Sequence, residues 1–145
     1  MFVKHDAEWP HGGGQPERRP ARDHLSEVER DLLWCLRRQA MVRPLGSARD
    51  PAVHALCQRR FGDAGLEAEH LLRCLLVGLA RRAIRPLTLR VPCFPALTDD
   101  EWRLLLAIRA AAVPARVAAL LAPMAGSRGG ELVPLVNGLA GLPLR

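Results

Sequence analysis

Apolar residues recur every three or four positions along most of the chain, and this pattern predicts a succession of α-helices. The first helix is expected to begin after Ser26, because Ser26 and Glu29 have the spacing of a capping box. It is expected to end near Arg43 and Pro44, since the residue before a proline disfavours the helical conformation. Its apolar stripe consists of Val28, Leu32, Cys35, Leu36 and Met41.

Two more helices are predicted before residue 86. Asp50 is a favourable N-cap and Pro51 suits the first helical position, so the second helix is expected to run from there through Phe61 and to stop at Gly62. The third helix follows a short turn and ends before Arg85. It is the most apolar of the three, so we expect it at the centre of the fold. Its apolar positions are Ala68, Leu71, Leu72, Leu75 and Leu79.

The segment PLTLRVPCFPAL, residues 86–97, alternates apolar and polar residues but contains three prolines. We therefore expect an extended crossover with at most a short edge strand. Thr98 and Glu101 form a second capping box and predict a fourth helix, which Pro114 interrupts. A fifth helix is expected to end at about Pro123. The Gly-rich segment from Ser127 and the sequence ELVPLVNGLAGLPLR after it predict one short apolar helix or a docking strap.

The predicted architecture is an all-α, compact bundle of about five helices with the Pro-rich crossover between the third and fourth. Residues 24–145 form the single helical domain. Residues 1–23 are interpreted as a flexible tail, because three consecutive glycines, several prolines and mixed charges give no periodic apolar face. The alternative for this tail is a partner-binding arm anchored by Phe2 and Trp9.

Composition supports a folded helical protein. Of the 145 residues, 49% are hydrophobic and 25% charged, which is typical of globular domains. Aromatic residues are scarce and tyrosine is absent, which favours helices over sheets. The chain shows no signal-peptide pattern and no apolar run near the roughly 20 residues of a membrane span. We expect a cytoplasmic protein without a membrane span, with its four cysteines as free thiols in apolar surroundings.

The formal net charge of +6 comes almost entirely from arginine, since Lys4 is the only lysine. Arginine pairs close the first three predicted helices, where positive charge complements the helix dipole. If these helices run up, down and up, the ends of the first and third meet at one pole, and Arg59 and Arg60 lie at the other. Guanidinium groups there would suit carboxylates or phosphates. The predicted partner-binding residues are Arg37, Arg38, Arg43, Arg81, Arg82 and Arg85.

The spacing H-x2-C-x12-H-x3-C raises the question of a metal site. Its residues are His54, Cys57, His70 and Cys74. Two His and two Cys side chains suit tetrahedral zinc, if the second and third helices form a hairpin. Both pairs lie on segments with strong helical signals, so we favour structural thiols. A zinc module, or an iron or redox role for Cys35 or Cys93, remains an alternative.

Nucleic-acid binding and catalysis have less support. The hairpin around Gly62 resembles a helix-turn-helix, but Glu67 and Glu69 stand beside His70 and Arg73 on the would-be recognition face and would repel phosphates. No nucleophile elbow, P-loop, dinucleotide-binding glycine pattern or zinc-protease motif is present. The acids Asp99, Asp100 and Glu101 are explained by their position at a helix start.

These observations predict a small, non-enzymatic helical interaction or regulatory protein that binds another protein through the arginine pole. One alternative is a nucleic-acid-binding regulator with a helix-turn-helix-like hairpin. The other is a zinc or redox module using His54, Cys57, His70 and Cys74. No cofactor is expected, and a homo-oligomer is compatible with the sequence.

Overall fold

The computed structural model of the protein describes residues 3–6 and 19–145. Helices dominate these residues, as the sequence predicts. The elements, in chain order, are β1 (Val3–Asp6), η1 (Arg22–His24), α1 (Glu27–Gln39), α2 (Pro51–Phe61), η2 (Gly62–Ala64), α3 (Gly65–Arg82), β2 (Leu87–Arg90), α4 (Asp99–Arg109), α5 (Pro114–Ala125), η3 (Gly126–Leu132) and α6 (Val133–Ala140).

The predicted helix starts are confirmed by their capping contacts. At the start of α1 the backbone N–H of Glu29 donates to the Ser26 hydroxyl, and the N–H of Ser26 donates to the Glu29 carboxylate. Thr98 and Glu101 make the same reciprocal pair at α4. Asp50 accepts from the second residue of α2, which ends at a glycine with positive φ. These contacts satisfy backbone donors that a helix start leaves free.

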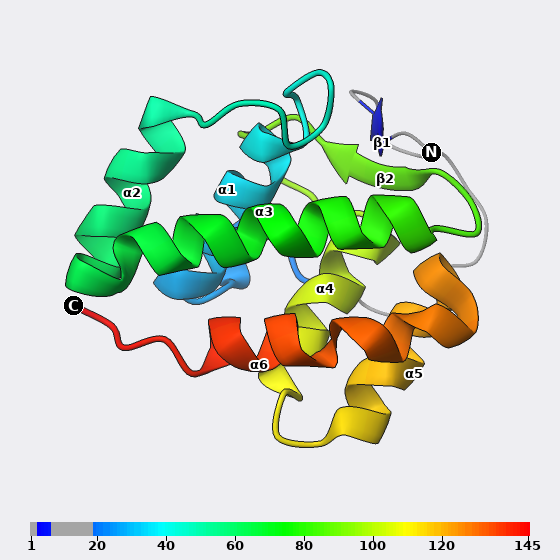
Figure 1. Cartoon of the computed structure of the whole chain (residues 1–145). Helices are drawn as coiled ribbons and strands as arrows, with labels where there is room; N and C mark the ends of the chain where they lie inside the picture. The colour runs from blue at the N-terminus through cyan, green and yellow to red at the C-terminus, as the bar shows by residue number, and fades with distance from the viewer. Residues whose placement is uncertain (1–2, 7–18) are drawn as a thin grey trace.

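Helix α3 lies across the centre of the molecule, and the other helices pack around it (Figure 1). Its core-facing leucines, Leu72, Leu75, Leu76 and Leu79, are completely buried or nearly so. Helix α6 runs antiparallel beside α3: a Cβ on Gly78 would approach Leu132, and one on Gly138 would approach Leu71. The predicted central position of α3 is therefore confirmed.

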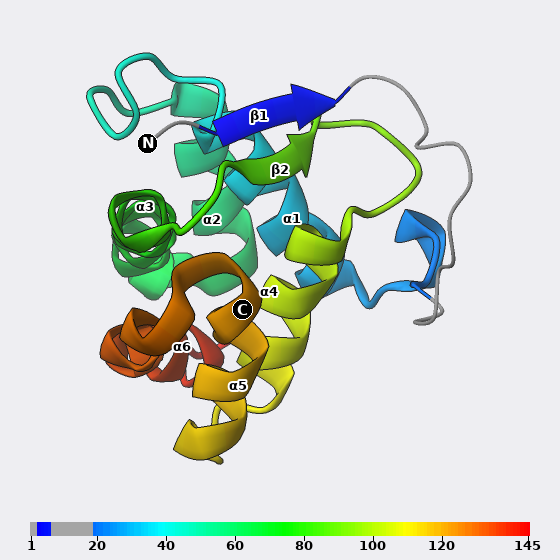
Figure 2. The ribbon, with the colours of Figure 1, turned by 90° about the vertical axis from the view of Figure 1, so that its right-hand side faces the viewer.

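The predicted bundle of about five helices is wrong. The described residues form six α-helices, including α6 where the sequence left a helix or a strap open. They do not all share one axis direction: Figure 2 views α3 along its axis, whereas α1 runs across that view. Helix α3 contacts α1, α2, α5 and α6. No helix among the described residues has the length and apolar character needed to cross a membrane.

The crossover between α3 and α4 contains the short strand β2, which pairs in parallel with β1. The register joins Val3 to Leu87 and Asp6 to Arg90. Residues 3–6 thus form a strand where the sequence predicted a flexible tail, because the open edge of β2 supplies backbone hydrogen-bond partners. Residues 19–23 also contact the body of the fold. Phe2 and Trp9, the predicted anchors of a partner-binding arm, lie outside the described residues.

Candidate functional site

The arginines predicted to form one exposed pole lie in different environments. Because α1 and α3 cross instead of running parallel, their C-terminal ends do not share one end of the molecule (Figures 1 and 2). Arg37 is completely buried, so its predicted place on a partner-binding surface is wrong. The physical reason is that Arg37 serves as an internal hydrogen-bond donor for the segment before α4.

Arg37 connects α1 to the crossover and to α4. Its Nε donates to Glu101 at 2.7 Å and its Nη2 donates to the same carboxylate at 3.0 Å. The remaining donors reach the backbone carbonyls of Pro92, Phe94 and Ala96 at 3.2, 2.8 and 2.8 Å. Neither side chain of the ion pair is exposed to solvent. A planar guanidinium with five donors can satisfy a carboxylate and several carbonyls at once, which lysine cannot.

Each of the three acids in the first turn of α4 forms an ion pair with an arginine of this chain. Each carboxylate takes one guanidinium from a different part of the fold. The pairs are Asp99 with Arg19 at 3.0 Å, Asp100 with Arg85 at 2.7 Å and Glu101 with Arg37 at 2.7 Å. The acids therefore act as structural anchors in addition to favouring the helix start, and Arg85 is engaged within the protein.

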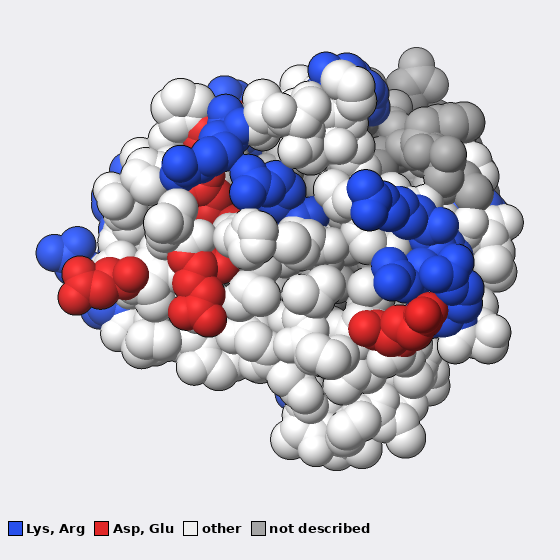
Figure 3. Space-filling view, in the orientation of Figure 1, with Lys and Arg blue, Asp and Glu red and all other residues white. Residues whose placement is uncertain are grey.

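The other predicted arginines are partly engaged as well. Arg38 donates to Asp50 at 2.6 Å, and Arg82 lies 3.3 Å from Glu131. Arg43 donates to nearby backbone carbonyls at the end of α1, whereas Arg81 is exposed. Figure 3 shows basic side chains gathered over the C-terminal end of α3 with acidic side chains beside them. This surface carries less unpaired positive charge than the sequence suggests.

The predicted zinc ligands do not assemble into a four-residue site. His54 on α2 lies 2.7 Å from Glu69, while Cys57, three residues on, is buried in the core. His70 and Cys74 contact each other at 3.5 Å on α3. Within residues 3–6 and 19–145, no three or more His, Cys, Asp or Glu side chains are grouped so as to hold a metal.

Glu69 is the centre of a buried ionic cluster between α2 and α3. Its carboxylate is 2% exposed and accepts from Arg49 at 2.8 and 3.0 Å. His54 contacts the same carboxylate, and the Gln39 amide donates to the Glu69 carbonyl oxygen. Hydrogen bonds from Arg49 hold the pKa of Glu69 below its usual value, although burial opposes this effect. Glu69 therefore does not lie on the exposed face that the helix-turn-helix alternative requires.

We expect Glu69→Gln to remove part of the pH dependence of stability. Because the folded-state pKa of Glu69 is depressed, its contribution is present above the usual glutamate pKa and is lost as pH falls through the lower, folded-state value. The variant should unfold about 1–2 kcal/mol more easily than wild type at pH 7, and this difference should shrink progressively as the pH falls below the usual glutamate pKa. Urea unfolding at several pH values measures it. A difference independent of pH would contradict the role of the ionised carboxylate.

The cysteines divide into a buried pair and two more accessible residues. Cys35 on α1 and Cys57 on α2 are buried neighbours, and all four cysteines are free thiols. The hydrogen bond to Cys57, together with burial, raises the pKa of the Cys35 thiol. Cys74 is partly buried and Cys93 is exposed, so the expectation of an apolar neighbourhood is wrong for Cys93.

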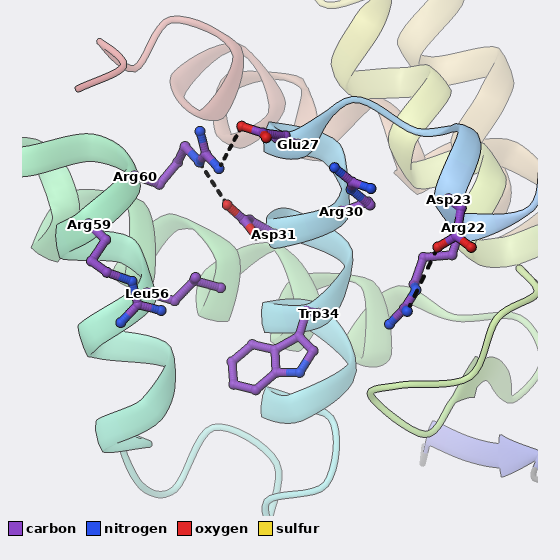
Figure 4. Close-up of a pocket in the computed structure, with 9 residues that line it drawn as sticks. All are labelled: Arg22, Asp23, Glu27, Arg30, Asp31, Trp34, Leu56, Arg59 and Arg60. Atoms are coloured by element: carbon purple, nitrogen blue, oxygen red, sulfur yellow. Dashed lines mark hydrogen bonds and ion pairs between the residues drawn. The ribbon is translucent and has the colours of Figure 1, made fainter.

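A hollow in the surface along α1 is a candidate binding site (Figure 4). Helix α1 forms its floor, and α2 and η1 form its two sides. Its volume is about 530 Å³, within the range of protein ligand sites. We call it the α1 groove. It is lined by Arg22, Asp23, Glu27, Arg30, Asp31, Trp34, Leu56, Arg59 and Arg60.

The apolar part of the α1 groove is formed by Trp34 and Leu56. The Trp34 indole projects from α1 toward α2, and Leu56 projects from α2 toward α1 (Figure 4). Both side chains are partly buried and pack against the core with the rest of their surface. The guanidinium of Arg38 lies over the indole, 5.6 Å from the ring centre. This contact holds the ring in place by a cation–π interaction.

The charged part of the α1 groove is only partly neutralised. Arg60 lies 2.7 Å from Asp31 and 3.6 Å from Glu27. In contrast, Arg30 and Arg59 have no ion pair or side-chain hydrogen bond within the part of the chain that the structure describes. Figure 4 shows Arg59 on the α2 side of the groove and Arg30 on the side of η1.

Arg22, also on the η1 side, has spare donors. Its Nη2 is 3.9 Å from Asp23, beyond hydrogen-bonding distance, and its Nε has no acceptor among the described residues. The α1 groove thus combines an apolar patch, formed by Trp34 and Leu56, with cations on both sides and the acids Asp23, Glu27 and Asp31.

Sequence reasoning missed the α1 groove. The sequence feature that could have indicated it is Trp34, a large apolar residue outside the core-facing stripe of α1. Its position opposite Leu56 depends on how α1 packs against α2, which periodicity does not specify.

A scan of protein-family models finds no matching family, and searches of curated proteins and solved structures find no similar protein.

Proposed function

We propose that this protein is a small, non-enzymatic interaction module that binds a partner protein in the α1 groove. The observation that carries the proposal is the partly exposed Trp34 beside Leu56, flanked by the unpaired Arg30 and Arg59. Tryptophan and arginine are the residue types most enriched among energetic hot spots of protein interfaces. A partly exposed tryptophan held by a cation–π contact also loses little conformational freedom on binding.

The proposed partner-binding surface is the α1 groove and not the arginine pole that the sequence favoured. Arg37 and Arg85 hold the start of α4, and Arg82 contacts Glu131. Binding a partner there would require breaking existing ion pairs, which reduces the net gain in affinity. In the α1 groove, two guanidinium groups are available without such a loss.

A Trp34→Ala variant is expected to weaken binding of the partner by roughly tenfold or more, since truncating a hot-spot residue costs more than about 1–2 kcal/mol. The partner is first identified with the wild-type protein, and its affinity for purified variants is then measured by calorimetry. Trp102→Ala is the matched control: Trp102 is also a partly buried tryptophan with an arginine over its ring, but it lies on α4 outside the groove. Equal loss with both variants would contradict the proposal.

A further inference from the structure

The arrangement of charge around Trp34 specifies the chemistry of the partner. Arg59 lies on one side of the α1 groove, and Arg30 and Arg22 lie on the other (Figure 4). Any occupant that covers the indole must therefore pass between cations. Carboxylates placed on both sides of an apolar side chain would meet these guanidinium groups, and such contacts are charge-assisted hydrogen bonds.

We infer that the α1 groove binds an acidic peptide segment that carries a bulky apolar anchor between its carboxylates. This inference rests on the proposed function. The anchor covers Trp34 and Leu56, while the flanking carboxylates contact Arg30 and Arg59.

The dimensions of the α1 groove fit a short segment. From Glu27 to Trp34 the floor extends over seven helical steps, or about 10 Å. Three or four extended residues span the same length. The floor therefore contacts only a few residues of a bound peptide.

A nucleic acid fits the same groove less well. Asp23, Glu27 and Asp31 also line it, and a continuous phosphate backbone would approach these carboxylates. A peptide can place its few charges next to the arginines and avoid the acids.

The test uses the full chain and a fluorescein-labelled peptide with a central Leu-Phe pair and two glutamates on either side. Binding is measured by fluorescence anisotropy at low salt. We expect saturable binding that the double variant Arg30→Glu/Arg59→Glu weakens roughly tenfold, because two ion pairs are replaced by repulsion. Raising the salt concentration should weaken wild-type binding in the same direction. Replacing Leu-Phe by Ser-Ser should abolish it.

The control is Arg116→Glu, which reverses the charge of one exposed arginine near the start of α5, outside the groove, and so changes the net charge half as much as the double variant. It should change the affinity by less than about twofold, apart from the general effect that a change in net charge has on binding at low salt. Circular dichroism of each variant checks that the helices are intact. An Arg116→Glu effect as large as that of the double variant would overturn the inference.

Two further probes separate the alternatives. A peptide with lysines in place of the glutamates should not bind, and equal binding of both peptides would refute the acidic partner. Tighter binding of a single-stranded oligothymidine than of the acidic peptide, with the same dependence on Arg30 and Arg59, would refute it in favour of nucleic acid. If neither probe binds but Trp34→Ala still weakens the identified partner, the proposed function stands and only the acidic segment is wrong.

Discussion

Replacing Arg37 with methionine is expected to lower the free energy of unfolding by about 3–5 kcal/mol. The substitution leaves the buried carboxylate of Glu101 without its cation, and three carbonyl oxygens lose a donor. A buried charge without a partner is among the most costly single defects in a protein. Urea denaturation followed by circular dichroism measures the change.

Arg38→Met is the control for this prediction. Arg38 is the next residue along α1 and also forms an ion pair, but its side chain is 42% exposed. Its loss should cost at most about 1 kcal/mol, because solvent screens exposed ion pairs. Similar destabilisation by the two variants would show that burial of the Arg37 ion pair does not increase its contribution to the free energy of unfolding.

A double variant separates the ion pair from the packing of Arg37. Adding Glu101→Gln to Arg37→Met removes the unpaired charge, so the double variant should be more stable than Arg37→Met alone, by about 1 kcal/mol or more. The substituted glutamine amide would still offer one acceptor oxygen to the Thr98 and Arg90 backbone N–H groups that Glu101 now binds. Additive losses in the two single variants would instead indicate that the side chains act independently.

Gly65→Ala is expected to destabilise the protein by about 1–3 kcal/mol. Gly65 begins α3 with ordinary helical torsion angles, so its backbone alone would accept alanine and even favour it. A Cβ at this position would lie 2.8 Å from the Gln58 Cα and 2.9 Å from the carbonyl carbon and oxygen of Cys57. Since these are backbone atoms of α2, the clash can be relieved only by moving α2 away from α3.

Gly130→Ala provides the control, because a Cβ there meets only the Ala118 Cβ at 3.7 Å, an ordinary contact. This variant should be neutral or slightly stabilising, by up to about 1 kcal/mol. Thermal unfolding of both variants measures the difference. A Gly65→Ala protein as stable as Gly130→Ala would mean that α2 and α3 can separate without loss.

The helix starts and the end of α2 were predictable because their signals are local, whereas α1 ends at Gln39 and not near Arg43 and Pro44 as predicted. Ser26 with Glu29 and Thr98 with Glu101 each satisfy a helix start within three residues, and Gly62 ends α2 through its own torsion angles. Met41 was assigned to the apolar stripe but is exposed, since α1 ends at Gln39 and the stripe does not continue. The central place of α3 followed from its high apolar content alone.

The partners of the charged residues were not predictable in the same way. The helix dipole accounts for arginines at the ends of helices and for acids at the start of α4 without any contact between the two groups. The sequence did not reveal that Arg37 and Glu101, 64 positions apart, would be buried together. The same holds for Trp34 and Leu56, whose shared groove depends on the packing of α1 against α2.

By itself, then, the sequence determined the helical class, the helix starts and the most apolar helix, because capping and periodicity act between residues at most a few positions apart. Only the tertiary structure decided that α1 crosses α3, that β1 pairs with β2, and which arginines stay unpaired in the α1 groove. The physical reason is that many arginines and acids of this chain could pair. Close packing of the apolar faces selects the pairs that meet.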